Sequence, residues 1–137
     1  MQKYRARISG PLLDRIDLQV DVPVAPFDRL VEERRGEASS TVRERVQRAR
    51  QVQLARFQGT ATRHNGMMTA PQIDQHCALT PEGIALLRRA SEKLGLSARA
   101  HSRVLKVART IADLAGAARV EVPHVAEAIQ YRKLDRE

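Results

Sequence analysis

One short run of alternating apolar and polar residues most constrains how this chain can fold, because the sequence that follows it is typical of helices. Residues 16–22 read Ile-Asp-Leu-Gln-Val-Asp-Val, and Pro23 ends the run. The alternation predicts a strand whose apolar residues share one half-buried face. Arg119–Val122 is the best candidate for a second strand and is very short. A lone strand leaves its backbone N–H and C=O groups unpaired. Either this strand is disordered or its partner strands lie outside this chain, and we favour the second, which makes the chain a fragment.

Downstream of Pro26 the sequence pattern is typical of helices. Phe27–Arg34 predicts a short helix before a linker. Thr41-Val-Arg-Glu44 has the pattern of a capping box, which predicts a helix running to about Phe57. Residues 59–68 are predicted to be a loop.

Residues 69–137 carry four more helix starts, each with a capping residue or an N-terminal proline. These starts lie at Thr69, Thr80-Pro81, Ser97 and Pro123. Apolar residues recur at helical spacing after the last three starts. They are Ile84, Leu87 and Leu94; Val104, Val107, Ala108, Ile111, Leu114 and Ala115; and Val125, Ala128 and Ile129. We therefore predict a compact four-helix unit over 69–137.

Positive charge is concentrated in one segment. The chain has 24 Lys and Arg against 16 Asp and Glu, a net charge of +8, and residues 39–68 hold six arginines against Glu44 alone. Such an excess is typical either of a solvated helix face or of a surface for an anion such as nucleic acid. The candidate nucleic-acid contacts are Arg43, Arg45, Arg48 and Arg50. Only four residues are aromatic, which argues against modules that bind by stacking bases on aromatic rings.

Several classes of protein are excluded by what the sequence lacks. No apolar run approaches the ~20 residues of a membrane span. Cys77 is the only cysteine, which favours a reducing cytoplasm. The four histidines are dispersed, without the paired spacing of a metal site, so we predict no bound metal. No glycine precedes Lys-Ser or Lys-Thr, so this chain has no phosphate-binding loop of its own.

Two arginines lie at positions that favour anion binding. Arg15 lies between a Gly-Pro break and the predicted strand, where it can project from the end of a sheet toward a neighbour. Arg99 lies in the first turn of the helix that Ser97 caps, where unpaired N–H groups and the helix dipole attract an anion. From the residues alone, both are better explained as surface arginines in local ion pairs than as anion-binding groups.

The sequence also resembles a known family. Residues 4–18 (Tyr-Arg-Ala-Arg-Ile-Ser-Gly-Pro-Leu-Leu-Asp-Arg-Ile-Asp-Leu) resemble the segment before the last core strand of magnesium-chelatase-like AAA+ ATPases, most of all those of the ComM (YifB) branch. Leu94–Ala100 with Arg103–Gly116 is similar to the lid helix of that branch, and His124–Arg132 to its closing helix. The resemblance covers essentially the whole chain.

The resemblance implies a mainly α fold, an AAA+ C-terminal helical lid preceded by a remnant strand of the α/β ATPase core. Residues 1–35 would be the core remnant with the arginine-finger segment, 36–68 a linker and basic helix, and 69–137 the lid. Arg15 would be the arginine finger that reaches ATP bound in the neighbouring subunit. Arg99 would be the sensor-2 arginine that contacts the γ-phosphate in its own subunit, with Arg103, one turn on, as the alternative.

The implied cofactors are ATP and Mg²⁺, held by the full-length protein and not by this fragment alone. The implied partners are its own N-terminal ATPase core, neighbouring subunits of a homo-oligomeric ring and DNA, with no membrane. We expect the full protein to be a cytoplasmic ATPase that couples hydrolysis to DNA remodelling, and the fragment to be inert.

Two other functions compete with this one. Helices 80–94 and 97–115 with a short turn between them superficially suit a free-standing helix-turn-helix DNA-binding module. Its second helix has few candidate base readers, and the basic excess lies elsewhere. A purely structural protein-interaction domain is the other rival.

Overall fold

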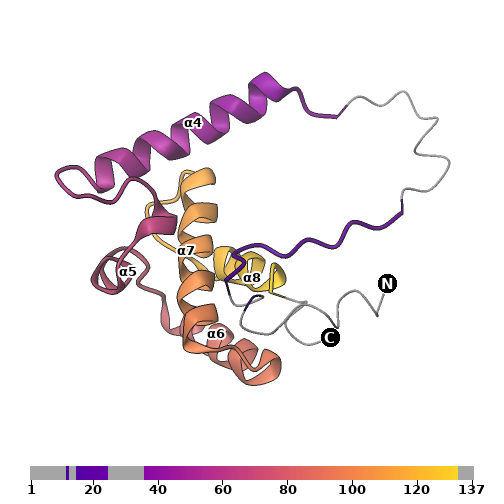
Figure 1. The fold of residues 1–137 in the computed structure, drawn as a ribbon. Coiled ribbons are helices and arrows are strands. Elements are labelled where there is room, and N and C mark those ends of the chain that lie inside the picture. The colour runs from indigo at the N-terminus through magenta and orange to yellow at the C-terminus, as the bar shows by residue number, and fades with distance from the viewer. Residues whose placement is uncertain (1–11, 13–14, 25–35, 133–137) are drawn as a thin grey trace.

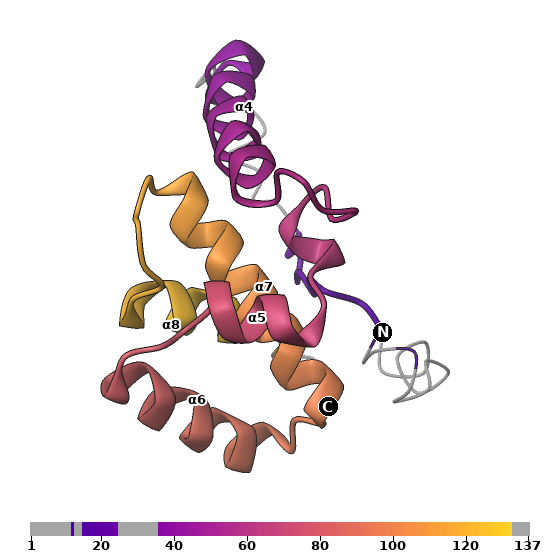
Figure 2. The ribbon, with the colours of Figure 1, turned by 90° about the vertical axis from the view of Figure 1, so that its left-hand side faces the viewer.

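Helix α7 (Ala98–Leu114) is the central helix of the structure, a computed structural model that describes residue 12, residues 15–24 and residues 36–132. Around it lie α4 (Ser39–Arg56), a short 3-10 turn η1 (Asn65–Met67), α5 (Ala70–His76), α6 (Pro81–Leu94) and α8 (Val122–Gln130). Figure 1 shows α5 and α8 on opposite sides of α7. Both Figure 1 and Figure 2 place α4 near the C-terminal end of α7 and α6 near its N-terminal end. The described residues form no strand.

The helix boundaries follow from local hydrogen bonds that the sequence predicted. Thr80 Oγ1 accepts from the Gly83 N–H at 3.2 Å, and Ser97 Oγ accepts from the Ala100 N–H at 3.1 Å. These bonds satisfy donors that the first helical turn leaves without partners. Gly95 follows α6 with φ at 63°, a left-handed conformation that ends the helix at little cost for glycine. The predicted four-helix unit is therefore confirmed as α5–α8.

The core consists of two apolar clusters joined by α7. The larger cluster packs α6, α7 and α8 together through Leu87, Val104, Ala108, Ala112, Val120, Val125 and Ala128. The smaller cluster lies under α5 and contains Phe57, Met68, Ile73 and Cys77. Leu105 of α7 packs against both. Three residues of the predicted apolar faces are exposed. Ile84 is 49% exposed and lines an open groove with Leu79 and His101. Leu114, 40% exposed, is the last residue of α7, and Ala115 follows it.

Helix α4 begins earlier than the predicted capping box. Its first residue is Ser39, after Ala38, so Thr41 lies inside the first turn and does not cap the helix. Residues 39–48 are all exposed, and Ala49 is the first buried residue of α4. The N-terminal half of the helix therefore extends past the body that its C-terminal half contacts (Figure 1).

Two further predictions need correction. Arg119–Val122 is not a strand: it is a loop up to Glu121, and Val122 already begins α8, one residue before Pro123. The alternating run 16–22 starts beside α8 and runs outward from the helices as an extended trace (Figure 1), without a partner strand among the described residues. Its apolar side chains are exposed and Gln19 is buried, the reverse of the predicted facing. The predicted helix Phe27–Arg34 lies outside the described residues.

Candidate functional site

Three cations gather on one face of α7, near its N-terminus. Arg99, Arg103 and Lys106 follow at four- and three-residue spacing, which places them side by side along the helix. With Ala98 and Ser102 they line an open pocket of about 370 Å³. Lys106 Nζ donates to the carbonyl of Gly66 at 3.0 Å. The pocket is therefore lined by cations from a single helix.

The helix start explains how Arg99 is presented. Ser97 caps α7 with its hydroxyl, so the helix begins immediately before Arg99 and exposes that side chain in its first turn. The first turn of α7 contains no acidic residue, and Arg99 makes no ion pair with any described residue. A cation at the positive end of a helix dipole is unfavourable unless an anion is close by. The geometry therefore suits an anion such as a phosphate group.

Arg103, the alternative to Arg99, has a different environment. Its Nη1 pairs with the carboxylate of Asp17, in the segment that follows Arg15. The side chains of Arg103 and Asp17 are 29% and 51% exposed. Arg103 is thus already neutralised by an acid of this chain, which distinguishes it from Arg99.

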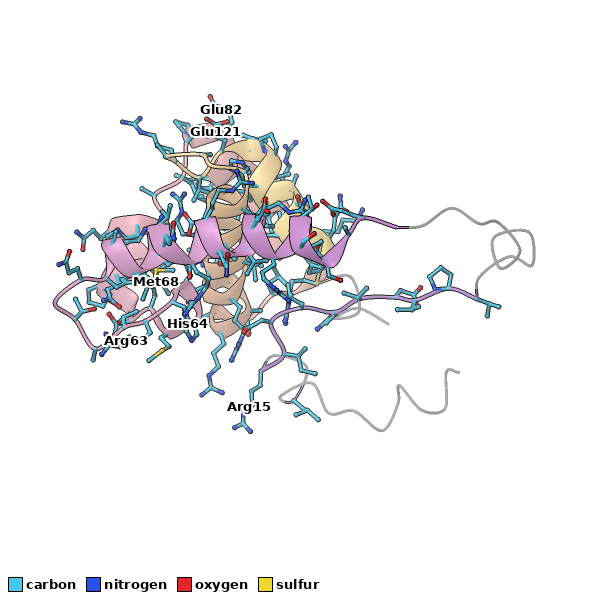
Figure 3. The ribbon with its side chains drawn as sticks, turned by 90° about the horizontal axis from the view of Figure 1, so that it is seen from above. Arg15, Arg63, His64, Met68, Glu82 and Glu121 are labelled. Carbon is cyan, nitrogen blue, oxygen red and sulfur yellow. The ribbon has the colours of Figure 1, made fainter. Side chains whose placement is uncertain are left out.

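Arg15 lies at the start of the described segment 15–24. Its N–H donates to the carbonyl of Leu12 at 3.0 Å, so the chain turns just before it. Figure 3 shows its side chain pointing away from the helices, on the opposite side of the molecule from Glu82 and Glu121. The structure does not bring Arg15 to the pocket of Arg99. Arg15 is instead directed outward.

The four arginines predicted on α4 do not form one patch. At 100° per residue, Arg43 and Arg50 lie on one flank of the buried face of α4, and Arg45 and Arg48 on the other. Arg45 pairs with both carboxylate oxygens of Glu37 at 2.8 and 3.0 Å, and Arg50 Nη1 donates to the Arg63 carbonyl at 3.4 Å. Arg43 and Arg48 are exposed and bind no other described residue.

A buried charge network that the sequence did not predict fixes α4 to α7. The Asp113 side chain is fully buried and accepts from Arg56 Nη1 and Nη2 at 2.7 and 2.6 Å. It also accepts from Asn65 Nδ2 at 2.8 Å and from Arg109 Nε at 3.1 Å. Burial raises the pKa of Asp113, but the hydrogen bonds from Arg56 and Asn65 and the charge of Arg109 outweigh burial and hold that pKa below its ordinary value. Arg109 also donates to the carbonyls of Ala117 and Ala118, which fixes the loop before α8.

The network is positioned to hold the fold and not to bind a ligand, because its acid is fully enclosed by side chains of this chain. Arg109 and Asp113 lie four residues apart on the apolar side of α7. An arginine and an acid at that spacing are the feature of the sequence that points to the network. Arg56 comes from 57 residues earlier, and no local pattern identifies it as the third member.

The histidine and cysteine of α5 contribute to packing. The ring of His76 lies edge-on to Phe57 with 5.6 Å between centroids. Burial, followed by the charges of Arg56 and Arg109, lowers the pKa of His76. Burial raises the pKa of the Cys77 thiol to about 11. Within 12, 15–24 and 36–132, no three His, Cys, Asp or Glu residues are grouped as a metal site would need. Nor does any helix of this part combine the length and apolarity required to cross a membrane.

The packing of α7 is unlike that of a recognition helix. α7 contacts α4, η1, α5 and α8, and its buried residues run from Ala100 to Asp113. A helix that enters the major groove of DNA must offer a face free of the rest of the protein over several turns. The helix-turn-helix interpretation therefore has no support from the fold.

Comparison with known proteins gives matches over nearly the whole chain. The family model "Magnesium chelatase, subunit ChlI C-terminal" matches residues 36–132, and the model "Magnesium chelatase, subunit ChlI" matches residues 1–30. The first match includes α4 together with α5–α8.

Individual proteins are also similar to this chain over nearly its whole length. The competence protein ComM of Haemophilus influenzae is 42% identical over 99% of this chain, and the uncharacterized protein YifB of Escherichia coli is 41% identical over 98%. The uncharacterized protein Rv2897c of Mycobacterium tuberculosis is 33% identical over 96%. The chain spans 26% of the length of each of these relatives. These matches, together with the helical fold, show that the chain belongs to the magnesium-chelatase-like family, in the branch of ComM and YifB.

Proposed function

We propose that this chain is the C-terminal lid portion of an AAA+ ATPase that couples ATP binding and hydrolysis to a change of conformation in a ring of subunits. The observation that carries the proposal is the cationic pocket at the start of α7, where Arg99 is exposed and unpaired among the described residues. Such a guanidinium can donate two parallel hydrogen bonds to a phosphate. In this role Arg99 is the sensor-2 arginine of its own subunit, and Arg103, paired with Asp17, is not.

Arg15 is proposed to act in trans, as the arginine finger. Its outward direction (Figure 3) supports a partner on another molecule. There it would stabilise negative charge on the transferring phosphoryl group of ATP, with Mg²⁺ held by the ATPase core. The described residues of this chain offer no acidic cluster for the metal, so the chain's own contribution is the two guanidinium groups.

The test uses the full-length protein. Arg15→Ala should lower kcat for ATP by about a hundredfold or more, since an arginine finger contributes ~10³–10⁵ in related reactions. Arg99→Ala should weaken ATP binding and also lower kcat. Arg89→Gln removes an exposed arginine of α6 outside both sites and serves as the matched control.

A mixing experiment separates action in trans from action in cis. Arg15→Ala subunits should regain turnover when mixed with subunits whose own phosphate-binding loop is inactivated, because an intact site then meets an intact finger. Unchanged turnover in Arg15→Ala, or no recovery on mixing, would refute the assigned role.

DNA is proposed as the molecule on which the ring acts, supported by the excess of arginine over 39–68. Arg43 and Arg48, one on each flank of α4, are the candidate phosphate contacts, because Arg45 is already paired with Glu37 and Arg50 donates to the Arg63 carbonyl. The slope of log K against log salt for duplex DNA should become shallower by up to about 2 in Arg43→Gln/Arg48→Gln. Arg45→Gln is the matched control and should change the slope less. Equal slopes in all three proteins would remove α4 from the DNA interface.

A further inference from the structure

The segment that carries Arg15 is bound to the lid helices at three points within four residues. The carbonyl of Ile16 accepts from Arg132 Nη1, and the carboxylate of Asp17 pairs with Arg103. The N–H of Gln19 donates to the carbonyl of Tyr131 at 3.0 Å. We call residues 15–19 the finger segment. Beyond it the chain leaves the body, since Val20, Val22 and Val24 are 62%, 80% and 93% exposed.

The contacts differ in how easily they can be broken. Arg132 is 1% exposed, so the guanidinium that donates to Ile16 is held inside the fold, although Ile16 itself is exposed. The ion pair of Arg103 and Asp17 is half-exposed, and pairs of this kind are weak and screened by salt. The Arg132 contact therefore provides a constant anchor, and the Arg103 contact is the adjustable one.

Helix α7 connects this attachment to the proposed nucleotide contact. Arg99 and Arg103 are one turn apart on the same face of α7, about 6 Å along the axis. The opposite face is fixed in the core, where Ala100, Val104 and Ala108 are no more than 1% exposed. One well-packed helix thus holds both the residue that would contact a subunit's own ATP and the residue that holds its finger segment.

We propose that Arg103 and Arg132 are positioning residues that join the finger segment to the lid, so that the lid of a subunit and the finger it presents to its neighbour move together. Nucleotide bound at Arg99 then biases the position of Arg15 in the adjacent site. This inference rests on the proposed function, and it adds a physical link between consecutive sites of the ring.

Two variants of the full-length protein test the link. Asp17→Asn and Arg103→Gln each remove the ion pair, and neither side chain is buried in the core. Each should raise the hydrogen-exchange rate of the Gln19 amide about threefold and lower kcat about threefold, in keeping with the modest strength of a half-exposed ion pair. The Hill coefficient for ATP should fall toward 1, while the Kd for ATP stays within twofold. The charge-reversed pair Asp17→Lys/Arg103→Glu should recover most of the lost kcat, which a loss of general stability would not allow. Arg89→Gln should leave all four quantities unchanged.

The outcomes separate this inference from the function on which it rests. If Arg15→Ala lowers turnover but Asp17→Asn and Arg103→Gln change neither amide exchange nor cooperativity, the link is wrong and the finger assignment stands. If Arg103→Gln weakens ATP binding as much as Arg99→Ala does, Arg103 belongs to the nucleotide site and the link is overturned. If Arg15→Ala has no effect on turnover, the proposed function fails whatever the exchange rates show.

Discussion

Replacing Asp113 by asparagine would show how much the contact between α4 and α7 depends on one buried charge. The carboxylate is fully enclosed, and the two guanidinium groups that donate to it are themselves only 13% and 4% exposed. Asparagine keeps the shape of the side chain but leaves Arg56 and Arg109 close together without a neutralising acid. Removing one partner of a buried ion pair costs about 3–5 kcal/mol, a large part of the ~5–15 kcal/mol that stabilises a typical domain.

Urea unfolding measures this loss directly. With a slope of about 2 kcal/mol per molar urea, the midpoint of Asp113→Asn should fall by about 2 M. Glu37→Gln is the matched control, because it also removes a carboxylate that receives two hydrogen bonds from one arginine, Arg45. That pair is exposed on both sides, so its midpoint should stay at the wild-type value. Equal midpoints for the two variants would refute the argument that burial makes the Asp113 network strong.

Three further predictions concern stability and reactivity. The pKa of Asp113 is held below its ordinary value of 3.8, so its contribution to stability is complete above about pH 5 and is lost as the pH falls through the lowered pKa; in urea titrations the midpoints of wild type and Asp113→Asn should therefore stay apart from pH 7 to about pH 5 and draw closer as the pH falls toward 3 and below. Gly95→Ala forces a side chain into left-handed backbone and should cost about 1 kcal/mol, while Gly36→Ala, with open space around it and no positive φ, should leave the urea midpoint unchanged. The Cys77 thiol, with its pKa raised to about 11, should react with a disulfide reagent at pH 8 only after unfolding; rapid labelling of the native protein would contradict its burial.

Local chemistry accounts for the helices that the sequence predicted correctly. Thr80 and Ser97 each bond to an N–H three residues on, and Gly95 adopts the conformation that ends α6. These features depend on neighbours within one turn, so they can be recognised without knowledge of the tertiary fold. The predicted start of α4, at Thr41, was wrong. Ser39, Ser40 and Thr41 are adjacent hydroxyl residues, and a pattern match selects one of them without regard to where the backbone becomes helical.

Long-range pairing explains what could not be predicted of the site. Arg103 meets Asp17 across 86 residues and Arg132 meets Ile16 across 116. No periodicity or motif links positions that far apart, whereas the position of Arg99 follows from the cap two residues before it. The sequence therefore identified single arginines and their helix, and the structure was needed to show which arginine already has an acidic partner. The roles of Arg15 and Arg99 in ATP turnover stay predictions.

The exposed N-terminal half of α4 would magnify any change in the angle at which this helix is held. The helix is held from Ala49 onward, and Ser39 lies about 15 Å beyond that point along the axis, at 1.5 Å per residue. A swing of about 20° at the held end would carry the free tip through roughly 5 Å, close to one helical pitch. A small change in the angle of α4 at Ala49 would therefore displace Ser39 much further than it displaces the residues that contact α7.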